Sequence, residues 1–416
     1  MSSMQSSSPI AFPTFADWRS RITSAGIKPV VVVAGSRGKT TVVRLLDAIF
    51  HEAGLRSAIW TDMGVEVEGT PQRGELVPWS RVDSRLDEGT LDVAVREIGW
   101  STVRTSGLQP ASAAIVAVTN VCANREACMI HGEARLASQT LPELLSAASP
   151  EGLVVLNGED FSVSGDEVPR DRPQWLVALH RVTPLLREHL SAGGNAAWVE
   201  DGSLVVGDAT ATRHLGRTDE LAFALNGAAG FEVHNGLMAA AVATAMGIGE
   251  SHISRALRAF RPSPRSMPGS FNIVDVNGVT AIVGLPEPSW FLRPVLRAVK
   301  DRAIGRLITV VGRLDPVPDV DLAEVGRLLG RASSGLVLHS ESENTSRATS
   351  FRQGVALSDV PPPIVHTPSE RRAITRALAM AKPRDFLLVL ADRPLPALRA
   401  LSRATRAGSR DMLAAD

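Results

Sequence analysis

The stretch that decides the fold runs from Lys28 to Gly54 and reads KPVVVVAGSRGKTTVVRLLDAIFHEAG. Its four consecutive valines are typical of a strand that is buried on both faces of a parallel sheet. From Thr40 onward, apolar residues recur at helical spacing, and Gly54 is placed to end that helix. The segment therefore predicts a strand, a glycine-containing loop and a helix in direct succession.

The loop between this strand and helix has the composition of a phosphate-binding loop, GSRGKT. Glycines let backbone N–H groups turn toward anionic oxygens, and the helix N-terminus adds about half a positive charge. In such a loop Lys39 reaches the β- and γ-phosphates, and the Thr40 hydroxyl ligates Mg²⁺. We predict a site for a nucleotide and Mg²⁺ rather than a chance glycine-rich turn; the family resemblance given below implies that this nucleotide is ATP. The predicted cofactor-binding residues of the loop are Gly35, Ser36, Arg37, Gly38, Lys39, Thr40 and Thr41.

The composition limits the class of protein. Of the 416 residues, 44% are hydrophobic and 21% are charged, as in ordinary globular proteins. The 44 basic and 44 acidic side chains cancel, so no broad positive field would attract nucleic acid. Lys39 is one of only four lysines among these basic residues.

Neither a membrane span nor a secretory signal is predicted, because no long apolar run and no charged leader region occur. The spacing of Cys122 and Cys128 fits neither a metal knuckle nor a redox motif, so two free thiols are expected. We therefore expect a cytoplasmic protein.

Strands and helices alternate through the first two thirds of the chain. Mainly apolar runs at Leu91–Ile98, Ala113–Val118 and Leu153–Leu156 predict further strands, with helical patterns between or after them. This alternation predicts right-handed crossovers and a mostly parallel sheet. Residues 160–230 are less regular, and we expect a β-rich insert there.

A linker is predicted at Arg261–Gly269, where three prolines fall within nine residues. Beyond it, Asn277-Gly278 lies between two apolar runs and predicts a type I′ hairpin. We predict an α/β protein with three parts: a tail and short helix over 1–27, an ATP-binding P-loop domain over 28–262, and a smaller Rossmann-like α/β domain over 263–416.

Several segments, in order along the chain, resemble the Mur ligase superfamily. They are the phosphate loop, V-R-E-I at Val95–Ile98, T-N at Thr119-Asn120, L-N-G-E-D at Leu156–Asp160, H-N at His234-Asn235 and V-G-R at Val311–Arg313. The similarity is greatest to the ligases of poly-γ-glutamate synthesis and to the C-terminal half of cyanophycin synthetase. It implies an ATP-binding central domain followed by a Rossmann-like domain.

The resemblance also implies a reaction. In this family a carboxylate attacks the γ-phosphate of ATP, an acyl phosphate forms, and an amine displaces phosphate to give an amide and ADP. By resemblance, Glu97 and Thr40 hold Mg²⁺, Asn235 neighbours the adenine and Arg313 contacts a phosphate. The candidate catalytic residues are Lys39, Arg125 and His234.

Three of these residues have a structural alternative. Glu97 would also suit a surface or capping role at the end of its strand. His234 would suit a buried histidine at a helix start. Arg313 would suit a salt bridge with Asp315.

Several positions depart from the family's pattern. The Asp-His pair expected after T-N is replaced by Asn124-Arg125, and arginine cannot ligate a cation. The arginine expected in the linker is Ser270, and Gly284–Ser289 lacks the family's Asp and His. The last Asn of H-N-x-x-N is Met238, and no residue in Ala134–Leu141 corresponds to the carbamylated lysine of some branches.

Two main functions are compatible with this combination of matches to and departures from the family's pattern. The first is an ATP-dependent, ADP-forming carboxylate–amine ligase for an amino-acid or peptide-like substrate, with one metal ion and Arg125 in place of a second cation. The second is an ATP-binding but catalytically degenerate paralogue that acts as a partner or regulatory subunit. Phosphotransfer to a small molecule is a third alternative. A partner protein or a homo-oligomer is left open.

Overall fold

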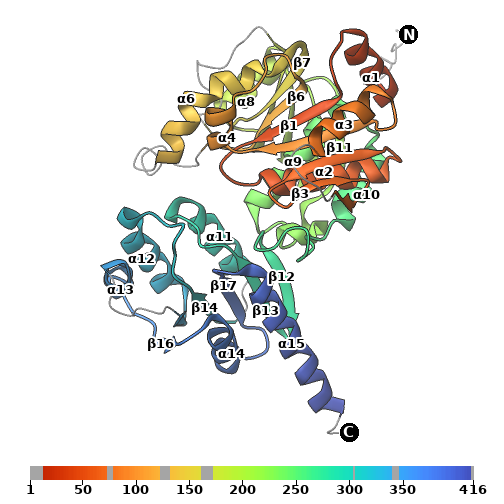
Figure 1. The fold of residues 1–416 in the computed structure, drawn as a ribbon. Coiled ribbons are helices and arrows are strands. Elements are labelled where there is room, and N and C mark those ends of the chain that lie inside the picture. Colours follow the sequence, from red (N-terminus) through yellow and green to blue (C-terminus); the bar gives the residue numbers. More distant parts are fainter. Residues whose placement is uncertain are drawn as a thin grey trace, which may run out of the picture. The chain divides into compact units, whose positions relative to one another are not determined.

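The computed structural model describes residues 13–72, 78–121, 132–160, 172–302, 305–339 and 346–413. The chain forms two compact units, which meet in the sequence between Phe260 and Arg261. Each unit has its own sheet covered by helices (Figure 1). The predicted α/β class is confirmed, including the mostly parallel sheet of the first unit and the smaller sheet of the second.

The first unit is built on an eleven-stranded sheet with the order β11-β10-β9-β8-β7-β6-β1-β5-β2-β3-β4. The strands from β9 to β2 in this order are parallel, and antiparallel strands extend both edges. The strands are β1 (Val30–Ala34), β2 (Ser57–Thr61), β3 (Gly64–Val67), β4 (Thr70–Pro71), β5 (Val93–Ile98), β6 (Ala113–Val118), β7 (Ala148–Asn157), β8 (Gln174–His180), β9 (Asn195–Glu200), β10 (Ser203–Gly207) and β11 (Thr212–Arg217).

The helices α2 (Lys39–Glu52) and α9 (Gly230–Ala245) contribute many of the residues that form the core with one face of this sheet. In α2 one side is buried, whereas the alanine-rich α9 is buried over most of its length. The other helices of the unit are α1 (Phe15–Ser24), α3 (Pro78–Asp87), α4 (Trp100–Ser106), α6 (Gly132–Ser146), α8 (Pro184–Ser191) and α10 (Glu250–Ala259), with short 3₁₀ turns at Thr218–Glu220 and Ala222–Ala224. All five residues of β1 are buried, as the valine run predicts.

Residues 160–230 differ from the expected insert. The described part of this segment contains β8, α8, β9, β10 and β11, and these four strands continue the main sheet. The segment is β-rich as expected, but its strands continue the main sheet and do not form an insert of their own. Trp175, Val177, Ala197 and Val206 from these strands belong to the same hydrophobic core as β1 and α2.

The second unit has a six-stranded sheet with the order β12-β13-β17-β14-β15-β16. Only the β12–β13 hairpin is antiparallel, and Asn277 and Gly278 at its turn both have positive φ, as a type I′ turn requires. The strands are β12 (Asn272–Val276), β13 (Val279–Gly284), β14 (Leu307–Val311), β15 (Gly335–His339), β16 (Ile364–Thr367) and β17 (Phe386–Leu390). The helices are α11 (Ser289–Arg302), α12 (Leu322–Ala332), α13 (Ser346–Ala356), α14 (Glu370–Met380) and α15 (Pro394–Leu413), with a 3₁₀ turn at Asp319–Asp321.

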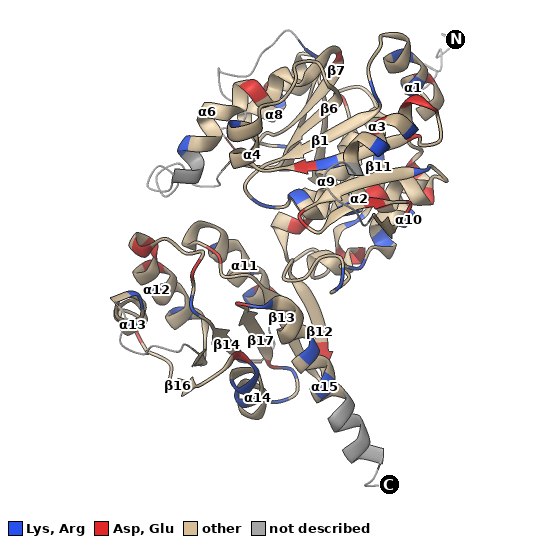
Figure 2. Ribbon diagram, viewed as in Figure 1, with Lys and Arg blue, Asp and Glu red and all other residues tan. Residues whose placement is uncertain are grey.

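Charged side chains of both signs are interspersed over each unit (Figure 2). This distribution agrees with the balanced composition. Among the described residues, no helix has the length and hydropathy needed to span a membrane.

Gly35 connects β1 to the loop in a conformation that leaves no room for a side chain. Its φ is 142°, and a Cβ at this position would lie 2.0 Å from Thr119 Oγ1 and 3.0 Å from the Asn120 carbonyl oxygen. Gly54, at the end of α2, has a φ of 72° and no atom within 4 Å of such a Cβ. Alanine would strain the backbone at both glycines, but only at Gly35 would it also clash with neighbouring atoms.

We expect Gly35→Ala to destabilise the protein more than Gly54→Ala does. Alanine at a left-handed position costs about 1–2 kcal/mol, and overpacking at Gly35 adds about 1–3 kcal/mol. Urea unfolding of the two variants measures the difference. Equal losses of unfolding free energy would contradict the close packing of the loop against Thr119 and Asn120.

Candidate active site

The carboxyl ends of the central parallel strands bring the predicted phosphate loop to one edge of the first sheet. The Ser36 amide donates to the Asn120 carbonyl oxygen at 2.9 Å. The Ser36 hydroxyl donates to the Val121 carbonyl oxygen at 2.8 Å and accepts from Trp100 Nε1 at 3.0 Å. Ser36 is thus fixed by groups of the protein itself.

The T-N pair after β6 clamps the middle of the loop. Asn120 Oδ1 accepts from the Arg37 amide at 3.1 Å. The Arg37 carbonyl oxygen accepts from Thr119 Oγ1 at 2.6 Å and from Asn120 Nδ2 at 3.0 Å. These bonds explain why T-N occurs at the end of the strand beside the loop.

The next four amides, from Gly38 to Thr41, have a different environment. Gly38 caps α2 with a φ of 85° and no side-chain hydrogen bond, and no described group accepts a hydrogen bond from these four amides. They include the first N–H groups of α2, where the helix dipole is positive. Open amides at a helix start are suited to an anion such as phosphate.

Glu97, at the end of β5, lies beside the first residues of α2. Its Oε2 accepts from Thr40 Oγ1 at 2.8 Å, and its Oε1 lies 3.8 Å from Lys39 Nζ. Oε1 is buried without a hydrogen-bond partner. Burial raises the pKa of the Glu97 carboxyl, and the nearby Lys39 ammonium opposes that rise.

This arrangement has the chemistry of a partial Mg²⁺ site. Mg²⁺ prefers oxygen ligands and is usually held by one or two carboxylates together with waters and substrate phosphates. The unpartnered oxygen of Glu97 and the Thr40 hydroxyl are two such ligands. The described residues contain no group of three or more His, Cys, Asp or Glu side chains that could hold a metal alone. Phosphate oxygens would therefore have to complete the site.

The start of α9 brings Asn235 against the loop. A Cβ at Gly38 would lie 2.3 Å from Asn235 Oδ1, so only glycine leaves room for this contact. Asn235 Nδ2 donates to Glu232 Oε2 at 3.0 Å. The structure thus brings Asn235 together with the phosphate loop, and its predicted contact with adenine stays a prediction.

His234 is buried beside the end of β8. Its Nε2 has no hydrogen-bond partner among the described residues. Burial lowers the pKa of the imidazole, while the Glu159 carboxylate and the Val177 carbonyl group oppose that effect. This environment favours a neutral histidine, and a catalytic role for His234 stays a prediction.

Glu232 is a residue of this site that was not predicted from the sequence. It is the only charged residue in α9 and is buried there, with Asn235 as its hydrogen-bond donor. Burial raises the pKa of the Glu232 carboxyl to about 7. Glu232 could have been noticed in the sequence because it is the single acidic residue of a helix made mostly of apolar and small residues.

We expect Glu232→Gln to reduce the pH dependence of stability. Because the folded pKa of about 7 exceeds the unfolded value of 4.5, the carboxyl costs nothing below pH 4.5 and destabilises the fold as pH rises toward 7. The full cost above pH 7 is about 3 kcal/mol, which glutamine avoids while keeping an acceptor for Asn235. Urea unfolding at pH 5 and pH 8 measures this. A wild-type protein equally stable at both values would contradict the burial of an ionisable carboxyl here.

Of the two remaining predicted residues, one belongs to the second unit and the other lies outside the described residues. Arg313 follows β14 in the second unit, where its amide donates to Asp392 Oδ1 at 3.0 Å. Its Nε lies 3.4 Å from Asp315 and 3.7 Å from Asp392, and its side chain is 58% exposed. The predicted ion pair with Asp315 is therefore present, and phosphate binding by Arg313 stays a prediction. Arg125 lies outside the described residues, as do Asn124, Cys122 and Cys128.

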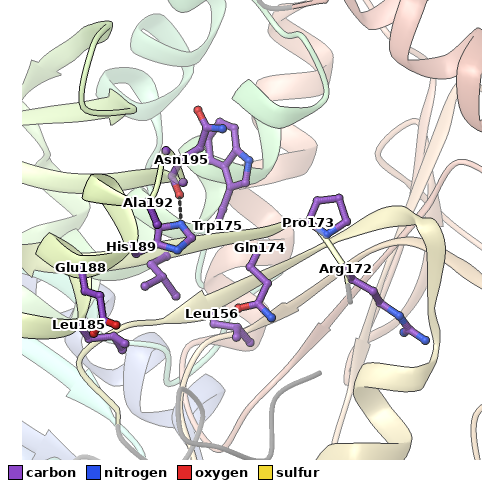
Figure 3. A pocket seen from close by; sticks show the side chains of 13 residues that line it. Leu156, Arg172, Pro173, Gln174, Trp175, Leu185, Glu188, His189, Ala192 and Asn195 are labelled. Atoms are coloured by element: carbon purple, nitrogen blue, oxygen red, sulfur yellow. Dashed lines mark hydrogen bonds between the residues drawn. The ribbon is translucent and has the colours of Figure 1, made fainter. Parts of the chain in front are cut away.

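A cavity of about 560 Å³ lies elsewhere in the first unit, between β8 and α8 (Figure 3). His189 in its wall bonds through Nε2 to the Asn195 carbonyl oxygen at 2.9 Å. None of the predicted site residues lines this cavity.

Comparisons with curated proteins give relatives of similar sequence. No family model matches the chain. Cyanophycin synthetase of Trichormus variabilis is 25% identical over 381 residues, which cover 88% of this chain and 42% of that protein. UDP-N-acetylmuramoylalanine--D-glutamate ligase of Pelotomaculum thermopropionicum is 28% identical over 235 residues, covering 56% of this chain and 44% of that protein. The chain spans less than half the length of these relatives.

Solved structures show the same fold at lower identity. E. coli FolC in complex with DHPP and ADP has a TM-score of 0.64 and 16% identity, covering 96% of this chain and 95% of that one. A pseudomurein peptide ligase type C from Methanothermus fervidus has a TM-score of 0.60 and 16% identity, covering 90% and 78%. MurF ligase from Thermotoga maritima in complex with ADP has a TM-score of 0.59 and 16% identity, covering 94% and 82%.

Proposed function

We propose that this chain, a member of the Mur ligase superfamily, is an ATP-dependent, ADP-forming ligase that joins a carboxylate to an amine. The superfamily assignment made from the motifs is confirmed by the sequence relatives and by the fold. The observation that carries the proposed activity is the set of open amides at Gly38–Thr41 next to Lys39, Thr40 and Glu97.

The loop residues would act by binding and neutralising the triphosphate. The four open amides would donate to phosphate oxygens, and the Lys39 ammonium would compensate charge on the β- and γ-phosphates. Thr40 and Glu97 would hold Mg²⁺, which supplies charge neutralisation on the same phosphates when bound. Positioning and electrostatic stabilisation of this kind account for most of the catalysis in phosphoryl transfer.

The proposed reaction has two steps. An oxygen of the substrate carboxylate attacks the γ-phosphorus, the bond to the β,γ-bridging oxygen breaks, and ADP leaves. The amine nitrogen then attacks the acyl carbon of the resulting acyl phosphate, inorganic phosphate leaves, and the nitrogen loses a proton as the amide forms. ADP in two of the structural relatives supports this choice of nucleotide.

We further propose that the substrates are amino-acid or peptide-like and that the reaction takes place in the cytoplasm. The relatives support this substrate class, since they include a cyanophycin synthetase and a UDP-N-acetylmuramoylalanine--D-glutamate ligase. An assembly with a partner protein or a second copy remains compatible with this function.

ADP release from the purified protein tests the proposal. Pairs of amino acids or short peptides, each pair offering one free carboxylate and one free amine, are supplied with MgATP in a coupled ADP assay. We expect at least one pair to raise ADP formation above the rate with either member alone. Oxygen-18 placed in the carboxylate should then appear in inorganic phosphate. Tight ATP binding without ADP release from any pair would favour the alternative of a catalytically degenerate paralogue.

A further inference from the structure

Arg96 is a charged residue in the interior of the first sheet. Its strand β5 lies between β1 and β2, and Arg96 is in register with Val32 on one side and Trp60 on the other. Successive residues of a strand point to opposite faces. Arg96 therefore lies on the opposite face of the sheet from Val95 and Glu97, the face that does not carry α2.

One nitrogen of the Arg96 guanidinium has no hydrogen-bond partner, and the residue as a whole is half-buried. Its Nε is buried without a hydrogen-bond partner, and no ion pair of Arg96 is recorded among the described residues. Burial lowers the pKa of the guanidinium, and Asp83 is the nearby carboxylate that opposes this effect. A buried N–H group without an acceptor costs free energy, so a ligand that accepts a hydrogen bond from Nε would relieve that cost.

Two tryptophans lie on the same side as Arg96. Trp60, its register neighbour, is 40% exposed although it belongs to a strand within the sheet. The ring of Trp60 packs against that of Trp79 on α3, with centroids 5.6 Å apart and an interplanar angle of 36°. Trp79 and Asp83 are four residues apart and so share one face of α3. This face of α3 therefore lies next to Trp60, which in turn neighbours Arg96 in the sheet.

We propose that Arg96, Trp60 and Trp79 form a binding site for a carboxylate carried on a flat or apolar group. A guanidinium fork matches the geometry of a carboxylate, and indole rings offer flat apolar surface. The single negative charge of Asp83 nearby disfavours a doubly charged phosphate relative to a singly charged carboxylate.

This inference rests on the proposed function, because it assigns the site to the acid substrate. Arg96 and Glu97 are consecutive, and Asp62, two residues beyond Trp60, lies near the Glu97 carboxylate. The site therefore lies near the same sheet edge as the phosphate loop, on the other face. Arg96 would anchor a carboxylate that does not react, so the acid substrate would have at least two carboxylates.

The test uses 4-fluorobenzoate as a probe and its neutral counterpart 4-fluorobenzamide, with binding to the full chain followed by ¹⁹F NMR. We expect the wild type to bind the benzoate more tightly than the benzamide. Arg96→Met should weaken benzoate binding by at least about 10-fold, the size expected for a lost charged hydrogen bond, and should leave benzamide binding unchanged. Arg104→Met, at an exposed arginine of α4, is the control and should change neither.

Thermal unfolding separates a binding role from a structural one. Because Arg96 is only half-buried, Arg96→Met should leave the Tm and the MgATP affinity close to those of the wild type. A Tm lowered by several degrees, benzamide bound as tightly as benzoate, or benzoate affinity unchanged in Arg96→Met would each overturn the site. If the benzoate results hold but the protein does not bind ATP, the proposed ligase function fails and the carboxylate site stands.

Discussion

Replacing Lys39 by alanine is expected to weaken ATP binding by about 100-fold or more, since losing one partner of a desolvated charge pair costs about 2–5 kcal/mol. Lys39 is mostly buried, with its side chain 16% exposed, and lies at the start of α2 beside the open amides. Isothermal titration calorimetry with MgATP measures the loss. The amides of Gly38–Thr41 remain in this variant, so a weak residual affinity is expected rather than none.

Lys300→Ala is the matched control for Lys39→Ala. Lys300 is an exposed lysine of α11 in the second unit, and its removal changes the net charge by the same amount. We expect its ATP affinity to equal that of the wild type. If Lys39→Ala bound ATP as the wild type does, the loop would not be the triphosphate site.

Replacing Glu97 by glutamine is expected to reduce turnover far more than nucleotide binding. The amide keeps the shape and can still accept from Thr40, but it loses the charge that would hold Mg²⁺. Losing one electrostatic contribution to the transition state costs on the order of 100- to 1000-fold in turnover. ATP affinity should change by no more than a few fold, because the amides and Lys39 remain.

The turnover of Glu97→Gln is measured as ADP release over a range of Mg²⁺ concentrations. We expect the concentration of Mg²⁺ needed for half-maximal activity to rise together with the fall in rate. Asp62→Asn is the control, since the Asp62 carboxylate lies near Glu97. Equal losses of turnover and of ATP affinity in Glu97→Gln would show that Glu97 does not hold the metal ion.

The phosphate loop could be predicted because its signal is local. Strand, loop and helix are consecutive in Lys28–Gly54, so no long-range pairing has to be known. The hairpin at Asn277-Gly278 is predictable for the same reason, since its turn needs positive φ at two adjacent residues.

Features that depend on distant partners could not be predicted in this way. The bond from Trp100 to Ser36 joins residues 64 positions apart, and nothing in either neighbourhood indicates it. The strands β8 to β11 were expected to form an insert because their pattern is irregular, yet their apolar side chains complete the main core. Sequence alone does not show which sheet an edge strand extends.

Two charged residues interrupt apolar stretches of the sequence, but their surroundings became clear only with the structure. Arg96 interrupts the mainly apolar run of β5, and Glu232 interrupts the small and apolar residues of α9. Both patterns indicate burial of a charge, but only the neighbours Trp60 and Asn235 show what each charge meets. The neighbours were beyond prediction because they come from other elements.

Calorimetric titration of the wild-type protein with MgATP and, separately, with AMP shows whether the loop binds a triphosphate. If the open amides and Lys39 hold a triphosphate, one ATP should bind per chain at least about 100-fold more tightly than AMP, which lacks the β- and γ-phosphates. Failure to bind ATP, or AMP binding of equal strength, would contradict the account.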